Sequence, residues 1–257
     1  MTTQDLQLDM HGPVAVVRLA RPAKRNALGD ALILALRKLF ENLPAQTRAA
    51  VLCGDGEHFC AGLDLSELKE RDAGQGLHHS RMWHAALERI QYGQVPVIAA
   101  LHGAVVGGGL ELASACHIRV ADATTFYALP EGSRGIFVGG GGAVRIPRLI
   151  GAARMTDMML TGRVYSAEDG ERIGMAQYLV PEGQAFDKAL ELAKRVAENA
   201  PLTNYALMHA LPRIAEQPAD QGFFTEALMA AVAQSAPEAK VRVKAFLDGK
   251  AAKVKKA

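Results

Sequence analysis

A run of three glycines, Gly107 to Gly109, separates an apolar stretch from a segment of helical composition. The apolar stretch, Val95–Leu101, has the composition of a buried strand. A strand that leads through glycines into a helix brings unpaired backbone N–H groups to one point. Glycine also lets a ligand approach that backbone closely. This stretch therefore predicts a turn whose main chain can hold a ligand.

Glu111 follows the glycines, inside the first turn of the expected helix. A carboxylate at this position is stabilised by the helix dipole, so Glu111 can be explained as a structural residue. The alternative is chemical, with a carboxylate acid or base placed beside an N–H group that binds an oxyanion. This stretch alone leaves both interpretations open.

A second turn of similar character lies at Cys60-Ala-Gly-Leu-Asp64 and presents the N–H of Leu63. If the two turns are adjacent, they supply two donors to one oxygen. Removal of one such donor typically costs about 10²–10³-fold in rate. Taken alone, the second turn is better explained as an ordinary loop.

Glu131 is a third candidate, because it follows a strand-like segment and precedes a glycine-rich loop, Gly135 to Gly142. A glutamate between proline and glycine is usually a solvated loop residue. It becomes a candidate for chemistry only if it faces Glu111.

Composition excludes several classes of protein. The chain has 257 residues, 49% of them hydrophobic and 22% charged, which is ordinary for a soluble globular protein. Its net charge of +2 gives no indication of nucleic-acid binding. Its basic tail, Lys250–Ala257, is expected to be a solvated terminus. The first residues lack the apolar core of a secretory signal, and no segment is apolar for long enough to cross a membrane. We therefore expect a cytoplasmic protein that binds neither nucleic acid nor membrane.

Cysteine usage and motif searches give no sign of a metal or a redox cofactor. The three cysteines, Cys53, Cys60 and Cys116, are odd in number and form no tight ligand pairs. The sequence contains no GxGxxG after its first strand, no GxxxxGK[ST], no HExxH and no GxSxG. We expect no metal site.

Strand and helix patterns alternate over about the first 130 residues, which predicts crossover connections and a largely parallel sheet. The expected strands are 14–20, 49–53, 95–101, 117–121 and 124–128, and the expected helices are 31–41, 66–71 and 79–92, with a loop at 72–76. Later, a strand at 177–180 and helices at 187–198, 202–214, 222–233 and 240–246 are expected. The pattern predicts an α/β core over residues 1–185 and a helical portion over 186–257.

Several motifs resemble those of one family. HGAVVGGGLELASAC is similar to the signature of the crotonase superfamily, the enoyl-CoA hydratases and isomerases, and FCAGLDL resembles that family's other oxyanion segment. RPAKRNAL, ALPEGSRGIFVGGGGAVRIPRLIG and LTGRVYSAEDGERIGMAQYLV resemble further blocks of the family, in the same order and with family spacing. The resemblance covers nearly the whole chain.

The resemblance implies a crotonase-like spiral of ββα units, a helical C-terminal part that makes trimers, often stacked as hexamers, and an acyl-CoA thioester as substrate. It implies that Leu63 and Gly108 donate their N–H groups to the thioester oxygen and that Glu111 and Glu131 are the catalytic glutamates. It also implies that five residues contact coenzyme A: Lys24, Arg25, Ala27, Ala61 and Asp64. No cofactor beyond the substrate's own coenzyme A is implied.

The expected activity is enoyl-CoA hydration, because both glutamates and both N–H turns are present. Departures from the family pattern at His117, Val138 and Ala143-Val144 affect the expected substrate more than the chemistry. Gly139 stands where dienoyl-CoA isomerases carry an aspartate, which argues against that reaction. The alternatives are another crotonase reaction (hydroxyacyl-CoA dehydration, hydroxycinnamoyl-CoA cleavage or thioester hydrolysis) and a non-catalytic acyl-CoA-binding protein.

Overall fold

The computed structural model describes residues 4–67 and 69–250. Three lysines of the basic tail, Lys253, Lys255 and Lys256, lie outside the described residues. Within the described ranges, no helix is both long enough and apolar enough to cross a membrane.

A six-stranded sheet forms the centre of the fold, with the strand order β1-β2-β3-β4-β6-β9. The strands β1 and β2 form an antiparallel hairpin, and every later neighbour pairs in parallel. The strands are β1 (Leu6–His11), β2 (Val14–Leu19), β3 (Ala49–Gly54), β4 (Val97–Leu101), β6 (Ile118–Asp122) and β9 (Tyr178–Val180). The predicted parallel sheet is therefore confirmed.

A smaller sheet has the strand order β5-β7-β8, in which β5 follows β4, β7 follows β6 and β8 follows a helix. Its strands are β5 (Ala104–Val106), β7 (Phe126–Ala128) and β8 (Tyr165–Ser166). The chain passes from β4 to β5 and then into helix α3 (Gly108–Ala115), which makes one ββα unit. The unit brings the glycine run to the point where the small sheet ends and the helix starts.

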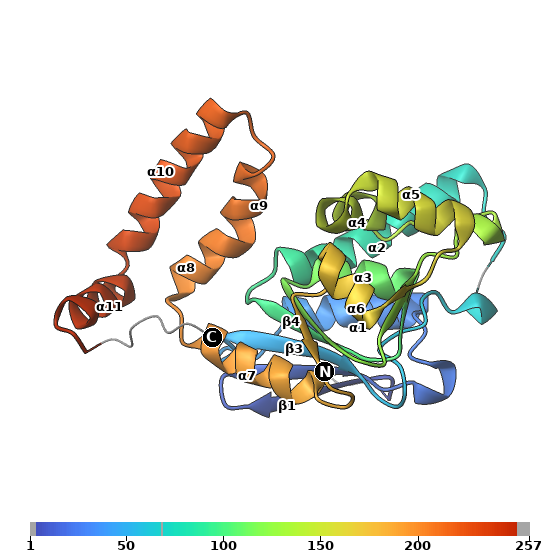
Figure 1. Cartoon of the computed structure of the whole chain (residues 1–257), viewed down its shortest axis with the longest axis horizontal. Helices are drawn as coiled ribbons and strands as arrows, with labels where there is room; N and C mark the ends of the chain where they lie inside the picture. The colour runs from blue at the N-terminus through green and yellow to red at the C-terminus, as the bar shows by residue number, and fades with distance from the viewer. Residues whose placement is uncertain (1–3, 68, 251–257) are drawn as a thin grey trace. The chain divides into compact units, whose positions relative to one another are not determined.

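Helices cover both faces of the large sheet because its strands are apolar on both sides. In β2, the side chains of Ala15, Val17 and Leu19 belong to one core, and Val14 and Val16 to the other. The first core is completed by α1, α2 and α3, and the second by α7 (Figure 1). The helices of this part are α1 (Asp30–Glu41), α2 (Ala73–Gln91), α4 (Gly142–Ile150), α5 (Ala152–Thr161), α6 (Ala167–Ile173) and α7 (Ala185–Ala197), with short 3₁₀ turns η1 (Pro22–Lys24), η2 (Leu65–Glu67) and η3 (Gly132–Arg134).

The chain divides into two compact units, of which the first ends at Ala197 and the second begins at Glu198. The sequence pattern placed this change near Ala185. The first unit continues past that point because α7 buries Ala189, Leu192 and Ala193 against the large sheet. The second unit contains α8 (Pro201–Tyr205), a π-helical turn η4 (Ala206–Ala210), α9 (Leu211–Ile214), α10 (Ala219–Ser235) and α11 (Pro237–Leu247).

Two local predictions were wrong. The expected loop at 72–76 is the start of α2, because Asp72 accepts a hydrogen bond from the Gln75 N–H and the Gln75 side chain accepts one from the Asp72 N–H. This capping box outweighs two glycines in the first turn. Of the helix expected over 66–71, residues 66–67 lie in the 3₁₀ turn η2 and residues 69–71 are not helical. By contrast, the helix expected over 202–214 is confirmed as a continuous run of α8, η4 and α9, with a π-helical turn in its middle.

We expect Leu192→Ala to lower the free energy of unfolding by about 2–5 kcal/mol, because it leaves a cavity between α7 and the sheet. Urea unfolding followed by circular dichroism measures this change. Leu160→Ala is the matched control, since Leu160 is 81% exposed. Equal midpoints for the two variants would contradict the assignment of α7 to the first unit's core.

Candidate active site

Two backbone segments that lie far apart in the sequence run side by side at the end of β5. The Cys60 N–H donates to the Ala104 carbonyl (2.9 Å), and the Val106 N–H donates to the Cys60 carbonyl (3.1 Å). A Cβ atom added to Gly62 would lie 2.7 Å from the Val106 oxygen and 3.3 Å from the Gly108 nitrogen. The structure thus brings the turn at Cys60–Asp64 against the glycine run.

The N–H groups of Leu63 and Gly108 lie at this junction. Leu28 pairs with both neighbours of Leu63, because its N–H donates to the Gly62 carbonyl (2.7 Å) and its carbonyl accepts from the Asp64 N–H (2.9 Å). The Leu63 nitrogen lies 3.5 Å from the position of a Cβ atom on Gly108. Gly108 is the first residue of α3, so its N–H has no acceptor within the helix. Two donors therefore flank one small space.

Glycine is required at two positions of the run. Gly107 has φ +53°, a conformation that side chains disfavour, and a Cβ atom there would lie 2.7 Å from Glu131 Oε1. A Cβ atom on Gly109 would lie 2.3 Å from the Cys60 carbonyl oxygen. The first glycine makes room for a carboxyl group, and the second lets the two backbone segments touch.

Glu111 points its carboxyl group at the loop before α4. Its Oε1 accepts hydrogen bonds from the N–H groups of Gly140 (2.8 Å) and Gly142 (2.7 Å). The residue is 4% exposed, and burial raises the pKa of its carboxyl to about 7, against the opposing effect of those two hydrogen bonds. With Oε1 held, Oε2 is the oxygen available for proton transfer.

Glu131 faces the same space, which makes it a candidate for chemistry. It is 7% exposed, and in the described part of the chain its buried Oε2 has no hydrogen-bond partner. Burial raises the pKa of Glu131, and its charge contributes to the raised pKa of Glu111. The two carboxyl groups are thus electrostatically coupled, and burial favours the neutral form of each.

A cavity of about 360 Å³ joins these groups. Leu63, Gly108, Glu111 and Glu131 line it together with Trp83 of α2. Atoms of the Trp83 ring lie 3.2 Å from a Cβ position on Gly108 and 3.1 Å from one on Gly140, so the indole forms a rigid wall. Other lining residues come from the segments before and within α2 and from the loop after η3: Lys69, Arg71, Gly76, His79, Ser80, Ile136, Phe137, Val138, Gly139 and Gly140.

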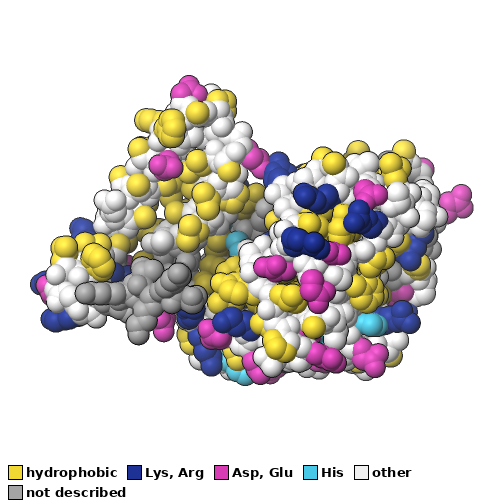
Figure 2. Space-filling view, in the orientation of Figure 1, with side chains coloured by type: hydrophobic (Ala, Val, Ile, Leu, Met, Phe, Trp, Pro, Cys, Tyr) yellow, Lys and Arg dark blue, Asp and Glu magenta, His cyan; other side chains and the backbone are white. Residues whose placement is uncertain are grey.

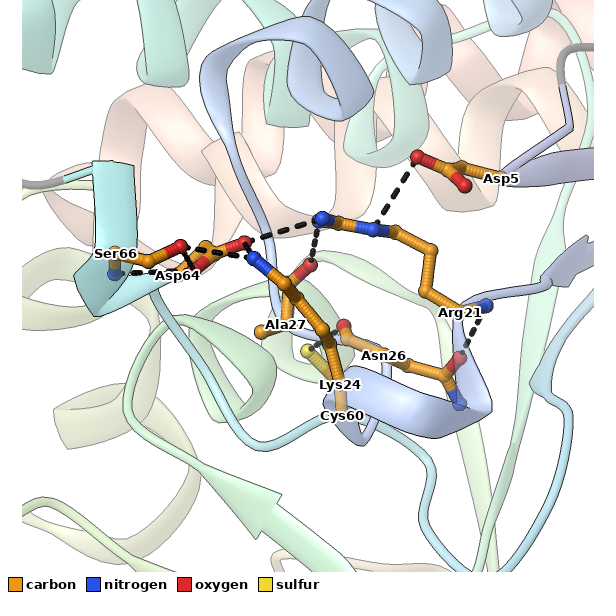
Figure 3. A network of polar contacts seen from close by, with 8 residues as sticks. All are labelled: Asp5, Arg21, Lys24, Asn26, Ala27, Cys60, Asp64 and Ser66. Carbon is orange, nitrogen blue, oxygen red and sulfur yellow. Dashed lines mark hydrogen bonds and ion pairs between the residues drawn. The ribbon is translucent and has the colours of Figure 1, made fainter.

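Three of the five residues expected to contact coenzyme A, Lys24, Ala27 and Asp64, belong to a polar network around Arg21 (Figure 3). Asp64 is 4% exposed and accepts hydrogen bonds from Arg21 (3.1 Å), Lys24 (3.0 Å) and the Ser66 hydroxyl (2.6 Å). The Ser66 hydrogen bond, followed by Lys24, holds the Asp64 pKa well below its usual range. Asp64 therefore serves as an anchor within the protein and is an unfavourable partner for a phosphate.

The other expected coenzyme A contacts lie beside this anchor. Arg25, in a left-handed backbone conformation, accepts a hydrogen bond from the Ala61 N–H at its carbonyl (2.9 Å). Lys24 and Arg25 are exposed, and Ala27 is buried under the same loop. The two exposed cations are suited to an anionic group, and the network ties their loop to the Leu63 turn.

Sequence reasoning missed the loop that holds Glu111. The glycine run Gly139–Gly142 was a usable signal, because consecutive glycines permit close backbone approach. The departure at His117 is structural, since its ring accepts from the Val97 N–H (3.0 Å) and contacts the Gln91 carbonyl (3.0 Å). Among the described residues, no cluster of three or more His, Cys, Asp or Glu side chains is placed to hold a metal ion.

Comparison with known proteins identifies the family. The family model for enoyl-CoA hydratase/isomerase matches residues 9–256. The chain belongs to the enoyl-CoA hydratase/isomerase family. The resemblance drawn from the sequence motifs, and with it the crotonase-type fold, is therefore confirmed.

Members of the family with different names resemble the chain. A solved structure from Rhodopseudomonas palustris CGA009, described provisionally as an enoyl-CoA hydratase, is 63% identical, with a TM-score of 0.94 and coverage of 96% of both chains. Carnitinyl-CoA dehydratase from Salmonella enteritidis is 35% identical and covers 86% of this chain and 85% of its own. The 2,3-dehydroadipyl-CoA hydratase of Escherichia coli is 31% identical over 91% of this chain and 92% of its own.

We expect Gly109→Ala to separate the two donor turns, because the new methyl group would overlap the Cys60 carbonyl. Loss of one donor's alignment typically costs about 10²–10³-fold in rate. Turnover of crotonyl-CoA by the purified variant measures the effect. Gly151→Ala is a control in which a Cβ atom meets nothing within 4 Å, although its φ of +84° carries some strain. Equal rates in the two variants would contradict the close-approach argument.

Proposed function

We propose that this family member is an enoyl-CoA hydratase, which adds water reversibly and in the syn sense across the 2,3-double bond of an acyl-CoA. The observation that supports this most directly is that one cavity contains both backbone donors and both buried carboxyl groups. Hydration needs a site for the thioester oxygen, a base for water and an acid for the α-carbon.

The N–H groups of Leu63 and Gly108 are assigned to the thioester carbonyl oxygen. When water attacks the β-carbon, the electron pair of the double bond moves into the thioester and places negative charge on that oxygen. Donors that are already aligned stabilise this enolate without reorganisation. Gly108 adds the positive end of the α3 dipole.

The two glutamates divide the proton transfers. Glu111 is assigned as the base for water, because its pKa of about 7 suits a group that must accept a proton near neutral pH. Glu131 is assigned as the acid that protonates the α-carbon of the enolate, since burial favours its neutral form. After each turnover, the proton on Glu111 returns to Glu131 through solvent. Water and substrate balance the reaction, so no metal or redox cofactor is part of the proposal.

Dehydration of a 3-hydroxyacyl-CoA is a second candidate, favoured by the 35% identity to a carnitinyl-CoA dehydratase. It uses the same groups in the opposite direction, with Glu131 removing the α-proton and Glu111 assisting the departure of water. Product analysis with enoyl-CoA and hydroxyacyl-CoA substrates distinguishes the preferred direction.

We expect Glu111→Gln to lower hydration of crotonyl-CoA by about 10²–10⁴-fold, because the amide cannot accept the proton from water. Loss of the conjugated thioester's ultraviolet absorbance measures the rate. Binding of butyryl-CoA, measured by calorimetry, should change little and is the control. Full activity in the variant would exclude Glu111 as the base.

The pH dependence follows from the same group. The base must be ionised, so kcat/KM of the wild-type protein should fall as the pH drops below about 7. Absence of hydration with short, bulky and aromatic enoyl-CoAs alike would reject the hydratase proposal and leave another crotonase reaction or a non-catalytic acyl-CoA-binding protein.

We also propose that the second compact unit mediates assembly into a homotrimer or homohexamer. Apolar residues occur around the whole of α10, a pattern typical of a buried helix. Yet Phe223 and Phe224 of α10 are 71% and 67% exposed. In α11, Val241 is 70% exposed and Leu247 76%. Hydrophobic side chains are visible over these helices in Figure 2.

Sedimentation velocity of the purified protein should therefore give the mass of three or six chains. Phe223→Glu should shift this distribution towards smaller species, because it places a charge in an apolar contact. A wild-type monomer at micromolar concentration would reject the proposed assembly.

A further inference from the structure

Arg145, in α4, is a buried cation that the catalytic scheme does not use. Its side chain is 8% exposed, although a guanidinium group is costly to remove from water. Its Nε donates to Gln91 Oε1 (2.6 Å), and its Nη1 donates to the Gly140 carbonyl (2.9 Å). Both acceptors are neutral, and no ion pair joins Arg145 to an acidic side chain of the described residues. A buried charge with only neutral acceptors calls for a specific role.

Gly140 connects Arg145 to Glu111. The Gly140 carbonyl accepts from Arg145, and the Gly140 N–H donates to Glu111 Oε1 (2.8 Å). The Gly142 N–H donates to the same oxygen (2.7 Å). Between them, Gly141 has φ +96°, and a Cβ atom there would lie 2.3 Å from Arg145 Nη1. The guanidinium therefore packs against the turn that presents both N–H groups to Glu111.

Helix α2 fixes the other side of this turn. Gln91, the last residue of α2, accepts from Arg145 and so ties α4 to α2. His84 of the same helix lies near the backbone of Gly139, which favours the charged form of its ring. Trp83 lies against Gly140, where a ring atom is 3.1 Å from a Cβ position. The turn is thus held from two helices, and Arg145 is the side chain that contacts both Gln91 and Gly140.

We propose that Arg145 is a positioning residue for Glu111. By holding Gly140 and the turn to Gly142, it keeps two N–H groups on Oε1 and leaves Oε2 directed into the cavity. The positive charge of Arg145 lies on the far side of Gly140 from Glu111. It also favours the ionised form of the Glu111 carboxylate, which must accept a proton from water. The inference rests on the proposed hydratase function for its kinetic readout, and it has a second readout that does not depend on that function.

The charges around Arg145 and Glu111 determine in which direction the pKa of Glu111 should change when Arg145 is replaced. On Glu111, Arg145 favours the ionised form, and Glu131 and burial favour the neutral form. Burial lowers the pKa of His84, and burial raises the pKa of the Cys116 thiol to about 12. The ionisable groups that interact electrostatically with Arg145 are His84, Glu88 and Tyr92 of α2 and its end, together with Glu111 and Cys116. Removal of the Arg145 charge should therefore raise the pKa of Glu111.

The test compares Arg145→Met, Arg145→Lys and Gln91→Ala with the control Arg148→Met. Arg148 lies in the same helix and is exposed, and its guanidinium contacts the Val144 carbonyl, one turn earlier in α4. For Arg145→Met, kcat for crotonyl-CoA should fall about 10- to 100-fold, the size of effect expected when a catalytic group is misplaced. KM should stay within about twofold, and the acid limb of kcat/KM should move to higher pH.

Arg145→Lys should keep the acid limb near its wild-type position while kcat falls, because lysine retains the charge but not the two-armed contact. Gln91→Ala should lower kcat with the charge in place, and it serves as the test if Arg145→Met does not fold. Arg148→Met should resemble the wild type. Equal kinetics in Arg145→Met and Arg148→Met would overturn the proposal, as would a fall in crotonyl-CoA binding that matches the fall in rate.

The second readout is the infrared band of the protonated Glu111 carboxyl, assigned by its loss in Glu111→Gln. Its pH midpoint should rise in Arg145→Met and stay near the wild-type value in Arg148→Met. If the wild type hydrates no enoyl-CoA, the proposed function fails and this titration alone decides the inference. An unchanged midpoint in Arg145→Met would overturn it.

Discussion

The contact between the Cys60 segment and the end of β5 is the constraint on which the site depends. Two hydrogen bonds hold Cys60 against Ala104 and Val106, and the carbonyl of Cys60 occupies the space that a side chain at Gly109 would need. Neither turn alone can place two donors on one oxygen. The proposed function therefore rests on a long-range backbone pairing that only the folded sheet provides.

Burial then gives the two carboxyl groups their chemistry. In water, both would be ionised at neutral pH and would repel each other in a small space. Inside the cavity, burial raises both pKa values, and the two N–H groups on Glu111 limit that rise. The same hydrogen bonds distinguish the residues, because Glu111 has one fixed oxygen, whereas Glu131 Oε2 has no partner among the described residues. Two identical side chains thus acquire different environments.

The sequence predicted the parts of this arrangement that depend on local pattern. Runs such as Ala49–Cys53 are apolar without interruption, which marks a central parallel strand, and Gly107–Gly109 marks a close approach of backbone. It could not predict which segment makes that approach, because the Cys60 pairing involves a three-residue strand too short to leave a periodic signal. The family motifs supplied that information.

Two further features were hidden for different reasons. The capping box at Asp72 decided a helix start that composition alone assigns to a loop. The contact of Arg145 with Gly140 depends on how α4 packs against α2, and an arginine in an amphipathic helix is expected on the solvent side. Tertiary packing, which no window of sequence contains, determined its burial.

One side of the cavity wall is buried and the other is exposed, and this difference affects which substitutions the protein can tolerate. On one side, Trp83 is wedged between Gly108 and Gly140, so substitutions there disturb the reacting groups. On the other, Phe137 is 71% exposed and Ile136 37%, and neither contributes to the buried core. Changes at these positions alter the shape offered to an acyl chain at little expense in stability. Selection can therefore explore new acyl groups on one wall while the reaction is preserved on the other.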